Sequence, residues 1–565
     1  MRAFLLCPPP SQDLWRLCTY SYPSMPVLAN MLPILKYLLA VCLLATSATA
    51  VPQIVDLSYR QYRGQELQNG LTQWLGIQYA APPIGDLRFR PPQDPPVVQG
   101  VQDAHHYGPV CLRTGQDPYY KETSEDCLYL DVMAPSNATE TSKLPVMVWI
   151  QGGAFNANTR PRFNSSGLIA AAQYDMVVVN FNYRVGLWGF LTNGDSITAN
   201  NGLRDQRKVL EWVQHHIHKF GGNKDHVVLV GSSAGAASVS FHMMADNGTD
   251  RGLFHGATLA SASYATILTI DESRYQYNNL AIRLGCTVKD SLACLRNKTA
   301  VEIQKVNTYN LPLPWAAKPP LYQWLPVLDN EFIPDYPYRA FSEGRVIKVP
   351  TIIGDDKNGG TDFTERTTAS LVDSNLWIAN QYPTITPDMF GEVNRLYPNS
   401  NNTCPNAGCY WRQLSDVYGD IRFMCPALFM SSQLRALGSS ASYSYLWNVE
   451  DPALMREGLG VPHTVETDAL LGTQYGKEGA PESYKPGGIN EMASPIMQGY
   501  WTSFIRSLDP NKYRYPGTAE WRNWETGSPR RIVFGTKGKT EMEEIPPELK
   551  EKCEFWVKYG VQMLL

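Results

Sequence analysis

The sequence predicts an α/β fold in which helices flank a central, mostly parallel sheet. Apolar, strand-like runs lie at 146–150, 176–180 and 227–230, and apolar residues recur at helical spacing between 204 and 220. A glycine-bracketed turn at 231–235 then leads into another helical pattern. This order of strands and helices is typical of a parallel sheet covered on both faces. Runs at 349–353 and 443–447 extend the sheet, and the stretches of about 271–345 and 364–440 are predicted to be large helical insertions.

Charge and motif content exclude several classes of protein. The 565 residues include 49 basic and 53 acidic side chains, a net charge of -4, which argues against a nucleic-acid partner. Gly538-Lys-Thr540 lacks the upstream glycine of a phosphate loop, and no dinucleotide-binding glycine motif follows the first strand. The sequence therefore predicts no cofactor.

The N-terminal residues resemble a targeting segment. After Met31 come one basic residue, Lys36, an apolar run at 37–45 and the small residues Ala48-Thr-Ala50, a pattern typical of a secretory signal peptide. The run is too short to cross a membrane, and no later stretch is long enough. We therefore expect an N-terminal extension and signal peptide in 1–50 (signal 31–50), one domain in 51–565, and a secreted protein without a stable membrane span.

Cysteine usage agrees with secretion. Three of the eleven cysteines lie before residue 51, and the remaining even set of eight predicts four disulfides. The spacing suggests the pairs Cys111–Cys127, Cys286–Cys294, Cys404–Cys409 and Cys425–Cys553. Glycosylation sequons begin at Asn137, Asn164, Asn247, Asn297 and Asn401. No metal site is predicted, because C-x-x-C is absent and His215-His-Ile-His218 lacks the i, i+4 spacing of a helical zinc motif.

Ser233 is the candidate nucleophile. It is the centre of Gly231-x-Ser-x-Gly235, and the motif stands between a predicted strand and a predicted helix. A strained turn of this kind exposes a serine hydroxyl above the end of a sheet. Of the nine histidines, only His463 follows a late strand, where the base is expected. The loop after strand 146–150 supplies the backbone N–H groups of Gly153 and Ala154, which with that of Ala234 are the candidate oxyanion donors.

These motifs resemble those of the type-B carboxylesterase/lipase family of α/β-hydrolases, to which fungal lipases and cholinesterases belong. The similarity covers nearly all of 70–560, including Glu125-Asp-Cys-Leu-Tyr-Leu-Asp-Val132, Asn182-Tyr-Arg184, Phe220-Gly-Gly222 and Asp509-Pro-Asn511. It implies an α/β-hydrolase fold and a serine carboxylic ester hydrolase that acts on a small-molecule ester or a lipid. It also implies the same roles for Ser233, His463 and the oxyanion donors, and supports the first two disulfide pairs.

The chain departs from the family at the acid of the catalytic triad. The family loop carries a glutamate where this chain reads Gly354-Asp-Asp-Lys-Asn-Gly-Gly-Thr361, so the acid position falls on Gly359. Asp356 and Asp362 are the candidate replacements, Glu466 could support them, and Asp355 is expected to be structural. Because this acid orients the histidine and stabilises its charged form, its loss lowers turnover by orders of magnitude. An alternative function is therefore a catalytically impaired relative with a binding role.

Overall fold

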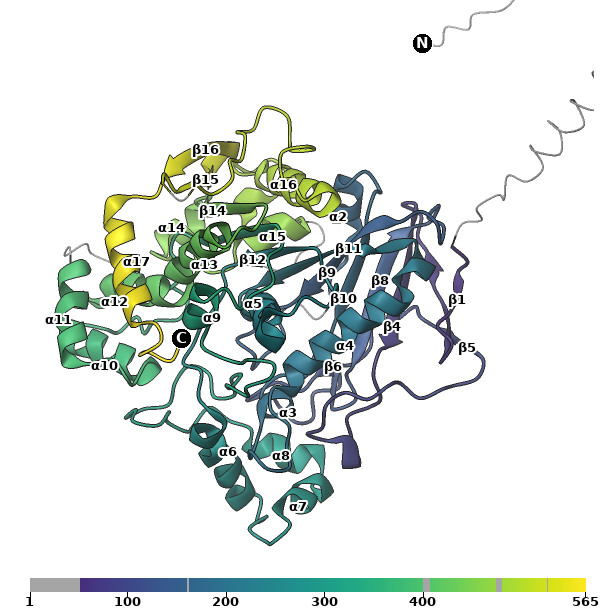
Figure 1. Ribbon diagram of the computed structural model, residues 1–565, viewed down its shortest axis with the longest axis horizontal. Coiled ribbons are helices and arrows are strands. Elements are labelled where there is room, and N and C mark those ends of the chain that lie inside the picture. Colours follow the sequence, from purple (N-terminus) through teal and green to yellow (C-terminus); the bar gives the residue numbers. More distant parts are fainter. Residues whose placement is uncertain (1–50, 160–161, 400–406, 474–479, 526) are drawn as a thin grey trace, which may run out of the picture. The chain divides into compact units, whose positions relative to one another are not determined.

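The computed structural model describes residues 51–565 except 160–161, 400–406, 474–479 and 526. These described residues form one compact unit (Figure 1). Within the described residues, no helix is both long enough and apolar enough to cross a membrane. The predicted signal peptide and the sequon at Asn401 lie outside the described residues.

The predicted sheet is confirmed and contains eleven strands (Figure 1). Side by side they are β16 (Lys539–Glu544), β15 (Arg530–Gly535), β14 (Ser442–Asn448), β13 (Thr351–Asp356), β12 (Gly256–Ala260), β11 (Gly222–Ser232), β9 (Leu144–Ile150), β10 (Val177–Phe181), β8 (Tyr129–Pro135), β4 (Leu71–Gln78) and β3 (Gln65–Glu66). The strands from β15 to β10 are parallel, and both edges are antiparallel. Two small sheets join β1 (Ile54–Asp56), β2 (Gln61–Arg63) and β5 (Val101–Asp103), and β6 (Val110–Cys111) and β7 (Thr123–Ser124).

Helices connect and cover the strands. The α-helices are α2 (Ser166–Ala171), α3 (Leu187–Phe190), α4 (Asn201–His216), α5 (Ala234–Gly248), α6 (Ile270–Arg283), α7 (Ser291–Asn297), α8 (Ala300–Val306), α9 (Pro337–Ser342), α10 (Leu371–Gln381), α11 (Pro387–Leu396), α12 (Trp411–Gly419), α13 (Cys425–Ala436), α14 (Pro452–Arg456), α15 (Glu466–Leu471), α16 (Ala493–Ser507) and α17 (Pro547–Tyr559). The 3₁₀ turns are η1 (Gly85–Leu87), η2 (Ile217–Phe220), η4 (Glu482–Tyr484) and η5 (Thr536–Gly538). A π-helical turn, η3 (Asp420–Met424), joins α12 to α13.

The central strands are buried on both faces, and their alternating side chains enter two separate cores. On β9, Val148 contributes to the core beneath α4, α5 and α13, whereas Trp149 contributes to the core beneath α2, α15 and α16. Successive residues of a strand point to opposite faces, so a continuous apolar run fills both cores. This explains the continuous apolar runs within β9, β10 and β11 in the sequence.

The predicted insertions differ in structure. The stretch 364–440 is helical, with α10, α11, α12, η3 and α13. The stretch 271–345 is helical only near its two ends, and no regular helix forms between 307 and 336. That segment contains six prolines, which cannot donate a backbone hydrogen bond and which clash with the preceding turn of a helix. The helical prediction for the middle of this insertion was therefore wrong.

Three of the predicted disulfides are present: Cys111–Cys127, Cys286–Cys294 and Cys425–Cys553. The last joins α13 to α17, the C-terminal helix. Cys409 is exposed and carries no disulfide among the described residues, and Cys404 lies outside them. The Cys404–Cys409 pair stays a prediction.

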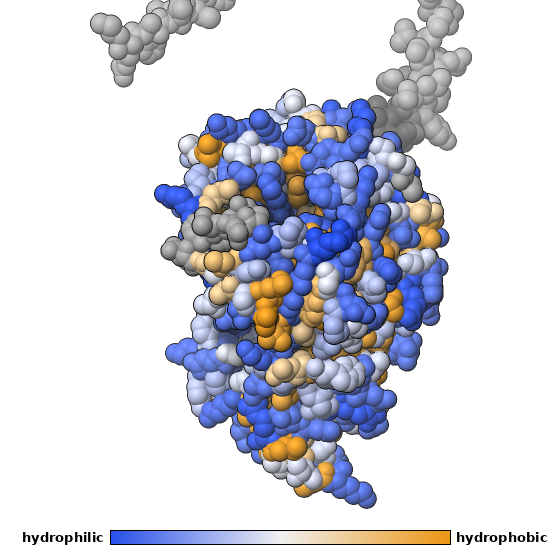
Figure 2. Space-filling model, turned by 90° about the vertical axis from the view of Figure 1, so that its left-hand side faces the viewer, coloured by the Kyte–Doolittle hydropathy of each residue, from blue (hydrophilic) through white to orange (hydrophobic). Residues whose placement is uncertain are grey.

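The surface in Figure 2 is mostly hydrophilic and carries several separate hydrophobic patches instead of one broad apolar area. Isolated apolar side chains are normal on a protein surface. The face shown therefore gives no indication of an extended apolar interface.

A buried ion pair fixes α4 beneath the sheet. The Arg184 guanidinium donates to both carboxylate oxygens of Asp205, with Nη2–Oδ1 at 2.6 Å and Nε–Oδ2 at 2.8 Å, and the side chains are 3% and 0% exposed. Removing one partner leaves the other charge buried and uncompensated. Asp205→Ala is therefore expected to lower the free energy of unfolding by about 3–5 kcal/mol, measured as a shift of the urea midpoint.

The exposed pair Arg530–Glu544 provides the control for this prediction, because its side chains are 36% and 61% exposed. Glu544→Ala is expected to cost less than about 1 kcal/mol. Equal losses in the two variants would contradict the assignment of Asp205 as a buried counterion.

Candidate active site

Ser233 lies in a strained turn between β11 and α5. Its backbone has φ 58° and ψ -123°, a region that L residues rarely occupy. The two glycines of the motif are required by close contacts. A Cβ on Gly231 would lie 2.4 Å from the Gly235 carbonyl oxygen, and a Cβ on Gly235 would lie 2.0 Å from the Ile150 carbonyl oxygen. The sharp turn presents the serine side chain at the carboxyl ends of the parallel strands.

His463 lies in the loop between α14 and α15, and its Nε2 is 2.8 Å from Ser233 Oγ. The structure thus brings together these two residues, which are separated by 230 positions. Phe423 of η3 stacks on the imidazole at 4.2 Å, and Phe363 meets it edge-on at 5.1 Å. Burial, assisted by the positive charge of Arg422, lowers the pKa of His463 to about 3. The ring is consequently neutral near pH 7 and able to accept a proton.

The loop after β9 faces the nucleophile, as the sequence predicts. A Cβ on Gly152 would lie 2.9 Å from the Ser233 Cβ, so this backbone passes directly over the serine. Gly153 and Ala154 have positive φ angles of 118° and 51°. Within the described part of the chain, their N–H groups donate to no hydrogen bond. Free N–H groups beside a nucleophile, together with the N-terminus of α5 at Ala234, can stabilise a developing oxyanion.

Asn156 holds this loop in place. Its side-chain amide donates to the carbonyl oxygens of Ala154 (2.9 Å) and Trp324 (2.8 Å). Its backbone N–H donates to the Gly153 carbonyl oxygen at 3.0 Å. With the Gly153 carbonyl fixed in this way, the neighbouring N–H groups keep their direction. The sequence argument missed Asn156, since an asparagine in a loop carries no signal of such a role.

A cavity of about 320 Å³ opens onto Ser233 and His463. Its walls include the aromatic side chains of Trp149, Tyr322 and Phe363. Asp362, a candidate acid, lies at its exposed rim, and desolvation by the surrounding residues raises the pKa of this carboxyl to about 6. The cavity has the size and the mixed apolar lining of a small-molecule site.

The acid position of the family is occupied by backbone alone. A Cβ on Gly359 would lie 3.2 Å from Phe423 Cδ2 and 3.4 and 3.5 Å from the two carboxylate oxygens of Asp355. Asp355 therefore fills the space into which a side chain at position 359 would extend. Its Oδ1 accepts a hydrogen bond from the Asp356 backbone N–H at 2.8 Å.

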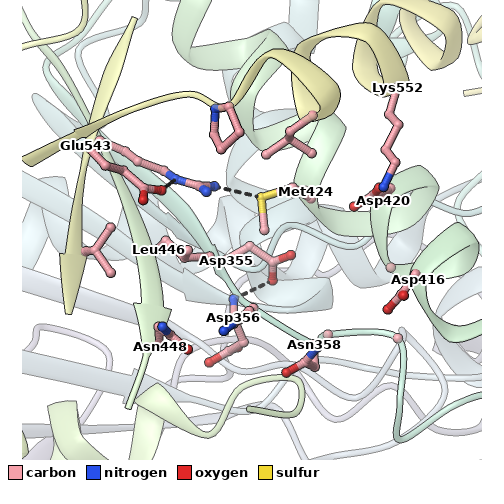
Figure 3. A pocket seen from close by; sticks show the side chains of 18 of the residues that line it. Asp355, Asp356, Asn358, Asp416, Asp420, Met424, Leu446, Asn448, Glu543 and Lys552 are labelled. Atoms are coloured by element: carbon pink, nitrogen blue, oxygen red, sulfur yellow. Dashed lines mark hydrogen bonds and ion pairs between the residues drawn. The ribbon is translucent and has the colours of Figure 1, made fainter. Parts of the chain in front are cut away.

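A second cavity, of about 450 Å³, lies behind this loop and is rich in acidic groups (Figure 3). The carboxyl groups of Asp355, Asp416 and Asp420 line it, and Lys552 of α17 lies beside Asp420. Desolvation raises the pKa of all three carboxyls, that of Asp416 to about 6.

Asp356 and Glu466 lie on the inner side of the histidine loop, and both are fully buried. Asp356 Oδ2 accepts hydrogen bonds from the Thr464 backbone N–H at 2.7 Å and from Ser261 Oγ at 3.0 Å. Carboxylate oxygens of Asp355 and Asp356 and a ring nitrogen of His463 lie within 4.8 Å of one another. Ser261 was not among the predicted site residues, because it follows β12 with no motif around it.

Comparison with known proteins gives consistent results. The carboxylesterase family model matches residues 51–556. The chain is 30% identical over 530 residues to secreted lipase 4 of Gibberella zeae, covering 87% of this chain and 89% of that protein. It is 29% identical over 533 residues to acetylcholinesterase of Bungarus fasciatus (88% and 84%) and 30% identical over 487 residues to acylcarnitine hydrolase of Mus musculus (80% and 82%). The crystal structure of Aspergillus niger EstA superimposes with a TM-score of 0.87 at 39% identity, over 91% of this chain and 99% of that chain.

Proposed function

Because the chain belongs to the carboxylesterase family and is therefore a carboxylic ester hydrolase, we propose that it is secreted and hydrolyses small esters through an acyl-enzyme at Ser233. One observation carries this proposal: Ser233 Oγ lies 2.8 Å from His463 Nε2 in a strained turn directly beneath a glycine loop. A nucleophile and a base within hydrogen-bond distance form the minimal unit of acyl transfer.

In the proposed reaction, Ser233 Oγ attacks the ester carbonyl carbon while His463 Nε2 accepts the hydroxyl proton. The N–H groups of Gly153, Ala154 and Ala234 stabilise the resulting oxyanion. His463 then donates its proton to the departing alcohol, which leaves the acyl group on Ser233. A water molecule, deprotonated by His463, attacks the carbonyl carbon of the acyl-enzyme. The bond from that carbon to Ser233 Oγ then breaks, the carboxylic acid is released, and His463 returns the proton to Ser233 Oγ.

Secretion is supported by the predicted signal peptide at 31–50, by the three disulfides, and by the similarity to a secreted lipase. The cavity of about 320 Å³ favours a small ester. Gly359 favours the second candidate function, a catalytically impaired relative that binds ligands in the same cavity.

A fluorophosphonate probe tests the nucleophile directly. We expect mass spectrometry to find the phosphonyl group on Ser233 in the folded protein and not on the adjacent Ser232, whose hydroxyl forms a hydrogen bond with Thr467 Oγ1 at 3.2 Å. Protein unfolded in urea should remain unlabelled. If folded protein fails to react under conditions in which a reference serine esterase reacts completely, the acyl-enzyme proposal is wrong.

A further inference from the structure

We propose that Asp356 has taken over the positioning role of the acid that is absent at Gly359, and that it shares a proton with Glu466. This inference rests on the proposed function, since it concerns the groups that support His463 during acyl transfer. It deepens that function by naming a residue that acts through the base.

The first argument is a pair of unsatisfied atoms. His463 Nδ1 and Asp356 Oδ1 are both buried, and neither has a hydrogen-bond partner among the described residues. When Nε2 accepts the Ser233 proton, Nδ1 carries the other ring hydrogen and needs an acceptor. Buried polar groups rarely remain unpaired, and catalytic hydrogen bonds are often longer in the unliganded enzyme than in the reacting complex. A ring nitrogen of His463 and a carboxylate oxygen of Asp356 lie within 4.8 Å of each other, so an approach of the two groups would satisfy both atoms.

The second argument is how the Asp356 carboxylate is held. Its Oδ2 accepts from the Thr464 backbone N–H, the residue that follows His463, and from Ser261 Oγ. One oxygen is thus fixed to the histidine loop itself, and the other stays free. A carboxylate anchored in this way can orient the imidazole and stabilise the imidazolium.

The other acids fit this role less well. Asp355 and Asp356 both line the acidic cavity (Figure 3), but Asp355 Oδ1 already accepts a hydrogen bond from the Asp356 backbone N–H at 2.8 Å, and neither Asp355 oxygen is among the buried atoms of the described residues that lack a partner. Asp362 lies at the rim of the substrate cavity and is not among the residues that gather within 4.8 Å of a His463 ring nitrogen.

Glu466 is the partner in proton sharing. Ser261 Oγ lies 3.3 Å from Glu466 Oε1 and 3.0 Å from Asp356 Oδ2, and Tyr445 Oη donates to the same Glu466 oxygen at 3.4 Å. The single hydroxyl hydrogen of Ser261 can serve only one carboxyl group at a time. Two carboxyl groups this close, and both buried, do not readily ionise together, because each charge raises the pKa of the other group.

The charges around Asp356 determine the expected pH dependence. The titratable groups that act on Asp356 directly are Asp355 on β13, Tyr445 on β14, Glu466 on α15 and Tyr484 on η4. Asp420 on η3 and Arg531 on β15 act on its neighbour Asp355, and Arg422 on η3 acts on His463. Burial, followed by the charge of Glu466, raises the pKa of Asp356 well above its ordinary value. Because Asp356 must be ionised to support His463 in this proposal, we expect the rise of kcat/KM with pH to lie at a higher pH than an ordinary aspartate would give.

The experiment measures kcat and KM for p-nitrophenyl acetate between pH 4 and 9 in four single variants. Asp356→Asn is expected to lower kcat by about 10³- to 10⁴-fold with KM changed less than about threefold, because an amide favours the wrong tautomer of the histidine. Asp355→Asn is expected to change kcat by less than about tenfold, and the matched control Asp416→Asn by less than about threefold. Glu466→Gln is expected to move the rising limb of kcat/KM to lower pH by at least about half a unit, because a neighbouring negative charge is gone.

Several outcomes would overturn the inference. If Asp356→Asn keeps more than a tenth of the activity, or if Asp355→Asn is the more damaging change, Asp356 is not the positioning acid. If the pH at which kcat/KM rises is the same in Glu466→Gln as in the wild type, proton sharing is rejected. The same measurement tests the inference if Asp356→Asn fails to fold. Failure of the proposed function is distinguishable, since the wild-type protein itself would then leave Ser233 unlabelled by the fluorophosphonate.

Placing the family's glutamate at position 359 provides an independent test of the inference. Gly359→Glu places a Cβ 3.2 Å from Phe423 Cδ2 and against the Asp355 carboxylate, so the new side chain is both crowded and electrostatically disfavoured. If Asp356 serves His463, this variant should gain no activity beyond about threefold. A gain of about a hundredfold or more would show that the acid was lost without replacement.

Discussion

Replacing Ser233 with alanine is expected to lower kcat for a short ester by about 10⁴- to 10⁶-fold. The hydroxyl oxygen that forms the covalent bond is removed, and His463 Nε2, 2.8 Å away, has no proton to accept from a nucleophile. The oxyanion loop and the cavity remain, so residual hydrolysis above the uncatalysed rate is expected. Initial rates with p-nitrophenyl acetate measure the effect.

The matched control is Ser232→Ala, one residue earlier, at the end of β11. Ser232 lines the same cavity, and its hydroxyl forms a hydrogen bond with Thr467 Oγ1 at 3.2 Å. Its replacement is expected to change kcat by less than about tenfold. The thermal midpoints of both variants should stay close to that of the wild type. Equal losses of kcat in the two variants would indicate that the turn between β11 and α5 is disturbed and would refute a chemical role of Ser233.

Gly235→Ala is expected to destabilise the protein by at least about 3 kcal/mol or to prevent folding. The added Cβ would lie 2.0 Å from the Ile150 carbonyl oxygen and 3.0 Å from that of Gln151. Both contacts are with backbone, which cannot rotate away as a side chain can. α5 would have to move off β9, and the oxyanion loop that follows Ile150 would move with it. Urea unfolding gives the loss of stability.

Gly391→Ala is the matched control, because it is also a glycine-to-alanine change within a helix. Gly391 is in α11, and a Cβ there would meet nothing within 4 Å. Alanine favours the helix over glycine, so a gain of about 0.5–1 kcal/mol is expected. If stability falls in Gly235→Ala and rises in Gly391→Ala, the steric contact, and not helix propensity, determines the effect at Gly235. A stable Gly235→Ala protein would contradict the packing described above.

The parts of the site that could be predicted from sequence are those with a local signal. The strand-turn-helix context identifies Ser233, the chain order identifies His463, and a glycine pair after a buried strand marks the loop that faces them. Phe423 could not be predicted, because it reaches the histidine through a π-helical turn that has no sequence signature. Ser261 could not be predicted either, because its contacts with Asp356 and Glu466 depend on long-range packing. The fold class was predicted for the same local reason, since apolar runs alternate with helical patterns.

The middle of the insertion at 271–345 was predicted wrongly from the sequence. The segment 307–336 was expected to be helical from its place between two helical patterns, yet its prolines prevent a helix. The acid of the triad could not be assigned either. Several carboxylates lie close together in the chain, and which of them faces the imidazole depends on the direction of each side chain at the end of β13.

The π-helical turn has a consequence for how this protein can change during evolution or design. A π turn contains one residue more than an α-helical path between the same two ends. Deleting a residue within 420–424 would restore a regular helix and rotate α12 against α13 by about 100°, the angle of one residue at 3.6 per turn. Because Cys425, at the start of α13, is tied to α17 by a disulfide, α13 could not turn to compensate. Phe423 would leave its stacked position on His463, so a change of length far from Ser233 in sequence would directly disturb the base.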